Sequence, residues 1–72
     1  MKIIKIHKEY IELQQLLKMV SIIQTGGEAK IFLKENIVLV NDLQENRRGR
    51  KLYPGDKIEV FGESYLIEVN ES

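Results

Sequence analysis

The chain has 72 residues, 43% hydrophobic and 31% charged, which is the composition of one folded domain and excludes a disordered chain. It has no cysteine, which excludes disulfide bridges and thiolate metal sites, and its longest apolar run, residues 37–40, is far too short to cross a membrane. The formal net charge is zero and the first residues lack the apolar stretch of a signal peptide, so we expect one cytoplasmic domain over residues 1–72.

The first two expected elements are a short strand and a helix. Ile4 and Ile6 alternate with polar residues, which predicts a half-buried strand. Apolar residues then recur at helical spacing, which predicts a helix that begins at residue 9 or 11 and ends at residue 19 or 20. The apolar stripe of this helix is Tyr10, Leu13, Leu16, Leu17 and Val20. We interpret it as core, with Lys18 facing solvent or a ligand.

A second helix is expected to begin after Thr25. Thr25 and Glu28 have the spacing of a capping box, in which the threonine caps the helix and the glutamate accepts a hydrogen bond from the Thr25 backbone N–H. The buried face of the helix is predicted to consist of Ala29, Phe32 and Leu33. Lys30 and Lys34 are four residues apart and share a different face, and Asn36 ends the helix.

From residue 37 onward the sequence alternates between strand and turn signals. Residues 37–40 predict a strand, Asn41-Asp42 a turn and residues 43–44 the start of a return strand. Residues 53–56, Tyr-Pro-Gly-Asp, predict a type II turn. Residues 57–61 and 65–69 predict two strands joined by a loop at Gly62-Glu63. The expected fold class is α+β, with two adjacent helices against an antiparallel or mixed sheet of three to five strands.

The charges are unevenly distributed. Residues 1–57 contain all 11 basic residues and 7 acidic ones, a net charge of +4, whereas residues 58–72 contain the other 4 acidic residues and no basic one, a net charge of −4. Residues 46–51, Asn-Arg-Arg-Gly-Arg-Lys, carry four positive charges; we call this segment the basic loop. Such a run is ordinarily a solvated loop, but arginine also binds phosphate oxygens and stacks on bases. The loop therefore favours a polyanionic partner.

No catalytic constellation can be assembled from these residues. The single histidine, His7, lies beside the first strand among charged residues, and Ser21 and Ser64 have no nucleophile signature around them. Gly26-Gly27 lacks the rest of a dinucleotide or P-loop motif. We therefore expect a binding module that is not an enzyme and has no metal or cofactor.

The glycine pair before the second helix has two interpretations. Gly26 and Gly27 can simply allow a sharp chain turn beside the cap. They can also let a phosphate approach the free N–H groups of the first helical turn. The two roles are compatible, because the side chain of Thr25 can cap one N–H group while others remain open.

Three segments of the sequence together match a known pattern: QTGGEAK at residues 24–30, FL at 32–33 and VLVN at 38–41. In these segments the sequence resembles the RNA-binding domain named after ribosomal small-subunit protein S4. The continuation NRRGRKLYPGD at residues 46–56 is similar to the short, stand-alone YaaA-type bacterial proteins, which are little more than this domain. The match covers about residues 11–69. It implies two packed N-terminal helices in an L-like arrangement followed by a small, mainly antiparallel sheet, the alpha-L motif.

The resemblance also implies an activity and a set of contact residues. The implied activity is binding of structured RNA, with links to ribosomal RNA and to ribosome assembly or association. Carried onto this sequence, the RNA-binding residues are Thr25, Gly26, Gly27, Lys30, Lys34, Asn41, Arg47, Arg48, Arg50 and Lys51. The family's usual Ser-Arg before the second helix is absent, and Lys30 is the expected replacement for that arginine. The usual Asn-Gly turn is Asn41-Asp42, which adds a negative charge.

The resulting hypothesis is a non-catalytic, monomeric module that binds structured RNA, ribosomal RNA in particular, without contacting a membrane. Three to five phosphate contacts predict a slope of about −2 to −4.5 for log affinity against log salt. Replacing Arg47, Arg48 and Arg50 by alanine is expected to weaken binding strongly while leaving the fold nearly intact. The alternative is a protein-interaction adaptor that uses the basic loop and the acidic C-terminal hairpin, or that pairs with a second copy.

Overall fold

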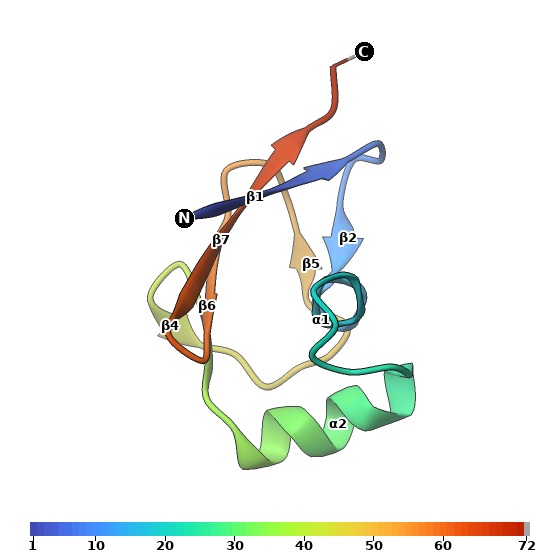
Figure 1. Ribbon diagram of the computed structural model, residues 1–72, viewed down its shortest axis with the longest axis vertical. Coiled ribbons are helices and arrows are strands. Elements are labelled where there is room, and N and C mark those ends of the chain that lie inside the picture. The colour runs from blue at the N-terminus through green and yellow to red at the C-terminus, as the bar shows by residue number, and fades with distance from the viewer. Residues whose placement is uncertain (72) are drawn as a thin grey trace.

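Two helices and two small sheets make up the fold, which the computed structural model describes for residues 1–71. In chain order the elements are β1 (Lys2–Ile6), β2 (Ile11–Glu12), α1 (Leu13–Met19), α2 (Gly26–Glu35), β3 (Val38–Val40), β4 (Leu43–Gln44), β5 (Lys51–Leu52), β6 (Lys57–Val60) and β7 (Glu63–Val69). The α+β fold class expected from the sequence is confirmed. Figure 1 shows β1 and α2 at opposite ends of the molecule.

The main sheet has five strands in the order β1-β7-β6-β3-β4, and β2 pairs with β5 in a separate two-stranded ribbon. All pairs are antiparallel except β1 with β7, which run parallel with Ile4 opposite Ile67. The sheet is therefore mixed, one of the two arrangements that the sequence left open. Its inner face buries alternate residues, among them Val38, Val40 and Ile58.

Helix α1 begins later than the apolar stripe predicts. Ile11 pairs with Leu52 in the ribbon, and Glu12 has extended backbone angles and is the N-cap. The Glu12 backbone N–H donates to the side chain of Gln15 at 2.9 Å, which fixes the start of the helix. The expectation that Tyr10 belongs to the helical face was therefore wrong. The fully buried part of the stripe is Leu13, Leu16 and Leu17.

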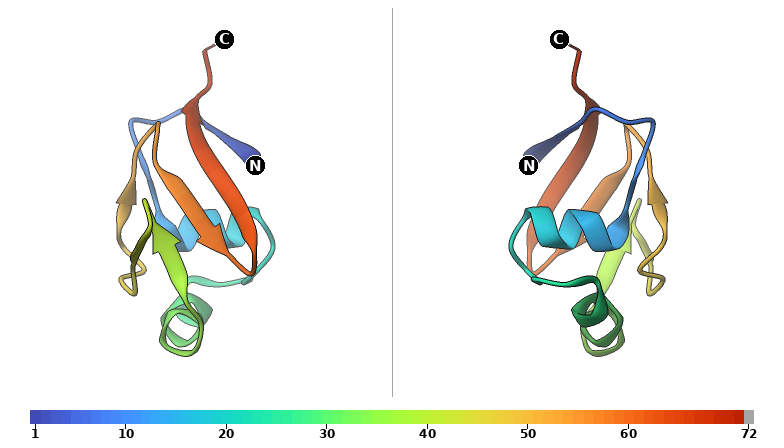
Figure 2. Two further views of the ribbon diagram at one scale, coloured as in Figure 1. Left: turned by 90° about the vertical axis from the view of Figure 1, so that its left-hand side faces the viewer. Right: turned by 90° about the vertical axis from the view of Figure 1, so that its right-hand side faces the viewer.

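Helix α2 has the cap expected from the sequence, with one difference. The Glu28 backbone N–H donates to Thr25 Oγ1 at 3.3 Å. The Glu28 carboxylate accepts from the backbone N–H of Gln24, also at 3.3 Å, and not from that of Thr25, so the capping box is shifted by one residue. Asn36 ends the helix as expected. Figure 1 shows α1 end-on and α2 from the side, and Figure 2 shows α1 from the side and α2 end-on. The two helix axes are therefore roughly perpendicular, which is the L-like arrangement.

Two of the three predicted turns lie where the sequence placed them. Asn41 and Asp42 both have positive φ, 51° and 70°, and join β3 to β4 in a two-residue hairpin. The Asp56 N–H donates to the Tyr53 carbonyl at 2.9 Å, with Gly55 at a φ of 98°, as a type II turn requires. The third expectation was wrong by one residue, because the positive-φ pair between β6 and β7 is Phe61-Gly62.

Candidate nucleic-acid interface

The basic loop is anchored to the start of α1. The first N–H groups of a helix have no partner within the helix and need one outside it. Here the Leu13 N–H donates to the Arg50 carbonyl at 2.8 Å, and the Gln14 N–H donates to the Arg48 carbonyl at 2.9 Å. In Figure 1 the yellow segment between β4 and β5 runs past α1 and above α2. The loop is therefore held at a fixed position beside both helices.

The start of α2 meets the basic loop at the same place. The guanidinium of Arg48 donates to the carbonyl oxygen of Gly26 at 3.1 Å, although the two residues are 22 positions apart in the chain. A Cβ on Gly26 would lie only 2.8 Å from Gln14 Oε1, which shows how closely α1 approaches this turn. Gly26, Arg48 and the beginning of α1 therefore converge.

Helix α2 separates its charges on two flanks. A residue in an α-helix is rotated by about 100° from its predecessor, so Lys30 and Lys34 continue the row that starts at Gly26. Glu28 lies on the opposite side of the buried stripe. Both lysines are exposed, and neither makes an ion pair with any residue in 1–71. We call Lys30, Lys34 and Arg48 the basic face.

Arg47 and Arg50 are engaged by a buried carboxylate. Glu45 is only 6% exposed, and its two oxygens accept from Arg47 Nε at 2.9 Å and from Arg50 at 2.7 Å. The Arg47 backbone N–H donates to the same carboxylate at 3.0 Å. Hydrogen bonding from Arg47, supported by Arg50 and opposed by burial, lowers the pKa of Glu45 from 4.5 to about 2.

These ion pairs change one expectation from the sequence. Because Arg47 and Arg50 neutralise Glu45 inside the fold, replacing all three arginines by alanine would also remove structural contacts and leave a buried charge without its cationic partners. Arg48 makes no ion pair within residues 1–71 and is the arginine that can be removed to test binding alone. The Arg47 side chain is still 71% exposed, so its outer edge faces solvent.

The remaining predicted site residues have different surroundings. Thr25 and Gly27 are exposed at the start of α2, where the Thr25 hydroxyl is used as the cap. The Lys51 ammonium lies 4.9 Å from the centroid of the Tyr10 ring. The Asn41 side chain donates to Asp56 Oδ1 and accepts from the Lys57 N–H, both at 3.0 Å, so both of its amide atoms join two turns of the sheet.

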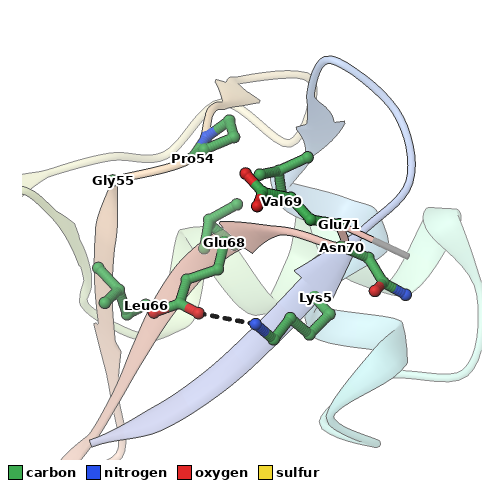
Figure 3. Close-up of a pocket in the computed structure, with 9 residues that line it drawn as sticks. Lys5, Pro54, Gly55, Leu66, Glu68, Val69, Asn70 and Glu71 are labelled. Carbon is green, nitrogen blue, oxygen red and sulfur yellow. Dashed lines mark hydrogen bonds and ion pairs between the residues drawn. The ribbon is translucent and has the colours of Figure 1, made fainter.

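Charged residues on the solvent-exposed side of the main sheet, which we call the outer sheet, form exposed ion pairs with one another. Lys5 Nζ lies 2.9 Å from Glu68 Oε1, and Lys2 lies 3.9 Å from Glu63. Figure 3 shows the Lys5–Glu68 contact inside a shallow pocket between β7 and the turn at Pro54. The Lys57 ammonium is shared by Asp42 and Glu59 at 3.1 and 3.4 Å. The acidic residues of the C-terminal hairpin are therefore largely neutralised by lysines.

Three residues of this region were missed or misplaced by sequence reasoning. Glu45 gave no signal beyond its position next to the basic loop. Tyr53 was assigned only to a turn, although its spacing of two from Lys51 across the buried Leu52 could have placed both on one exposed face. For Phe61 the sequence leaves open whether the ring is exposed for base stacking or covers a sheet edge; the residue is 66% exposed and packs edge-to-face on Phe32.

Within residues 1–71 there is no group of three or more histidine, aspartate and glutamate side chains that could hold a metal ion. In the same residues, no helix is both long and apolar enough to span a membrane.

Two helices meeting in an L, followed by a small sheet and a basic loop, define an S4-type architecture, and the comparisons agree. The family model described as the S4 domain matches residues 4–68, so the chain belongs to the S4 domain family. The chain is also 58% identical over 67 residues to the probable ribosome maturation protein RlbA of Bacillus subtilis (strain 168). That alignment covers 93% of this chain and 94% of the relative. The name of that relative assigns it to ribosome maturation.

Proposed function

We propose that the chain is a monomeric, non-catalytic module that binds structured ribosomal RNA in the cytoplasm during ribosome assembly. The basic face, together with the backbone at Gly26 and Gly27, contacts phosphates of the RNA. The outer edge of Arg47 and the Lys51 ammonium extend this contact along the basic loop. The ribosome maturation protein to which the chain is similar supports the choice of process.

The observation that carries the proposal is the contact between Arg48 and Gly26. This hydrogen bond, 3.1 Å long, joins the basic loop to the first turn of α2. It places a guanidinium at one end of the row that continues through Lys30 and Lys34. Cations from two distant parts of the chain thus form one surface, which is what binding to a phosphate backbone requires.

The geometry favours recognition of RNA shape over recognition of sequence. The basic face offers point charges and a guanidinium, which pair with phosphates whatever the bases are. Double-stranded RNA is recognised largely through its phosphates and 2′-hydroxyls. Lys30, Lys34, Arg48 and Lys51 are the four cations counted as phosphate contacts. Four contacts predict a slope of about −3 for log affinity against log salt concentration.

The test removes two charges from the basic face and two from the outer sheet. The double variant Lys30→Ala/Arg48→Ala and the matched control Lys2→Ala/Lys5→Ala lose the same formal charge. Each phosphate contact changes affinity by about fivefold to eightfold between 1 M and 0.1 M salt. We expect the first variant to bind about 25- to 60-fold more weakly in 0.1 M salt, and the control to bind within twofold of wild type.

Binding is measured by fluorescence anisotropy with labelled ribosomal RNA fragments and with unrelated hairpins of equal length. Thermal melting of each variant checks the fold. Equal loss of binding in the two double variants would show that general charge, and not the basic face, holds the RNA. Equal binding of unrelated hairpins would contradict the choice of ribosomal RNA.

The charges also bear on the adaptor alternative. An adaptor docking through the C-terminal hairpin needs free carboxylates, but Glu59, Glu63 and Glu68 each lie within 4 Å of a lysine ammonium. The cations of the basic face have no such partners in residues 1–71. The cations of the basic face are therefore unpaired and close together, which favours a polyanion.

A further inference from the structure

The ribbon formed by β2 and β5 has one buried face and one exposed face. Ile11 and Leu52 lie opposite each other and both point into the core. Side chains alternate along a strand, so Lys51 and Tyr53, on either side of Leu52, point outward. In the same register Tyr10 lies across from Tyr53. The outer face of the ribbon therefore presents two tyrosines and a lysine directly after the basic loop.

The two tyrosines form a fixed aromatic pair. Their ring centroids are 5.7 Å apart with an angle of 46° between the planes, and Lys51 Nζ lies 4.9 Å from the centroid of Tyr10. Tyr10 is half-buried, whereas Tyr53 remains 43% exposed. The backbone of Tyr53 is held as well, because its N–H donates to Asp56 Oδ2 at 2.8 Å. The exposed ring is thus supported from one side and fixed at its base.

The free side of Tyr53 faces an open groove with a cationic lining. The groove is lined by Arg47, Gly49, Arg50, Lys51, Tyr53 and Asp56. Asp56 is the carboxylate of this set, and it already accepts hydrogen bonds from the Asn41 amide and the Tyr53 N–H. An exposed aromatic ring among arginine and lysine is the combination that binds an unstacked base and its flanking phosphates.

We propose that Tyr53 is a stacking platform for an unpaired nucleotide of the bound RNA. The inference rests on the proposed function and specifies its ligand: a structured RNA that carries a bulged nucleotide within a helix. The base stacks on the Tyr53 ring, and the adjacent phosphates lie along Lys51 and the outer edge of Arg47. A continuous duplex cannot use this site, because its base faces are covered by their neighbours.

The alternative for Tyr53 is a purely structural role, in which it covers Tyr10 and the edge of the ribbon. The two roles require different side chains at position 53: stacking needs an aromatic ring, whereas covering Tyr10 needs only an apolar side chain. Tyr53→Phe keeps a flat aromatic ring and serves both roles. Tyr53→Leu keeps an apolar cover but cannot stack on a base. Phe61→Leu is the matched control, since Phe61 is an exposed aromatic residue at the other end of β6.

The first experiment uses Tyr53→Trp, which introduces the only tryptophan of the chain. Its fluorescence is titrated with a ribosomal RNA hairpin that has one bulged adenosine in its stem, with the same hairpin without the bulge, and with adenosine monophosphate. We expect strong quenching by the bulged hairpin and weak quenching by the paired one. Quenching of equal strength by both hairpins, or by the mononucleotide at the concentration of the bulged hairpin, would overturn the inference.

The second experiment compares affinities for the two hairpins in 0.1 M salt. Stacking of one base on an aromatic side chain corresponds to a change of about fivefold to 150-fold in affinity. We expect wild type, Tyr53→Phe and Phe61→Leu to prefer the bulged hairpin by at least about fivefold, and Tyr53→Leu to lose that preference while it melts as a folded protein. An unchanged preference in Tyr53→Leu would contradict the stacking role.

The two proposals fail in different ways. If wild type binds neither hairpin, the proposed function and this inference both fall. If wild type binds both hairpins equally, and the Lys30→Ala/Arg48→Ala variant loses that binding, the basic face stands and only the stacking site is overturned.

Discussion

The basic loop and the outer sheet both carry charged side chains, but they use them in different ways. In the loop, Arg47 and Arg50 close around Glu45, a carboxylate that is only 6% exposed. On the sheet, Lys5 and Glu68 form a pair in which both partners are largely in solvent. The first arrangement fixes the loop, whereas the second neutralises a surface and holds little in place.

This difference explains how one small chain with a formal net charge of zero can present a charged face. The sheet cancels its own charges in exposed pairs, and the loop uses two arginines to support its shape. Arg48, Lys30 and Lys34 are left without ion pairs in residues 1–71. The net charge therefore says little about binding, because the positions of the unpaired charges decide it.

The largest expected difference between the basic loop and the outer sheet is in unfolding free energy, when one glutamate in each region is replaced by glutamine. Glu45→Gln leaves two arginines facing a neutral amide inside the fold, and hydrogen bonds to a charged group are worth about 1.5–3 kcal/mol. We expect it to lower the free energy of unfolding by about 2 kcal/mol. Glu68→Gln removes an exposed pair and should cost less than about 0.5 kcal/mol. Urea denaturation of both variants measures the contrast, and equal losses would contradict it.

Acid should destabilise the fold at the basic loop, as Glu45→Gln does, because it protonates the Glu45 carboxylate. The pKa of Glu45 is lowered to about 2 in the fold from 4.5, so the stability it provides is fully present above about pH 4.5 and is lost as the pH falls toward 2. We expect a loss of about 2 kcal/mol by pH 3 from this group. Because other carboxylates titrate in the same range, the measurement is the difference in unfolding free energy between wild type and Glu45→Gln.

That difference should shrink steadily between pH 5 and pH 3. A gap that stays constant with pH would show that the Glu45 carboxylate does not carry the stability assigned to it.

The smallest expected effect concerns backbone access at the start of α2. A Cβ on Gly27 would meet only Thr25 Oγ1, at 3.8 Å, so Gly27→Ala should not lower stability. It should weaken RNA binding by about fivefold, which corresponds to about 1 kcal/mol for one hydrogen bond. The reference is wild type, because Gly49 lines the groove beside Tyr53 and cannot serve as a control. Anisotropy titrations that give equal affinities for Gly27→Ala and wild type would remove the backbone from the interface.

Local features of the fold were predictable from the sequence because they follow from local rules. The Thr25 cap and the turn at residues 53–56 depend on residues within four positions of each other. The stripe of Leu13, Leu16 and Leu17 follows from helical spacing alone. The basic loop followed from the charge pattern of residues 46–51, whereas its grouping with the start of α2 came from the family resemblance. The structure contains a contact between the two, from Arg48 to Gly26.

Features that depend on distant partners were missed. Tyr10 has the spacing of a helix residue, but the ribbon pairing of Ile11 with Leu52 keeps the chain extended there. Glu45 is an ordinary loop carboxylate in sequence, and its burial follows only from the position of the two arginines. The turn at Phe61-Gly62 was set by the register between β6 and β7, with Val60 opposite Glu63.

The parallel pairing of β1 with β7 has a consequence for how the molecule is made. Residues 2–6 are synthesised well before residues 65–69, their partners in the sheet. β1 must therefore remain without this partner until the domain between them has been translated, and pairing across such a long loop is slow to form. The main sheet is thus completed only after β7 has been made.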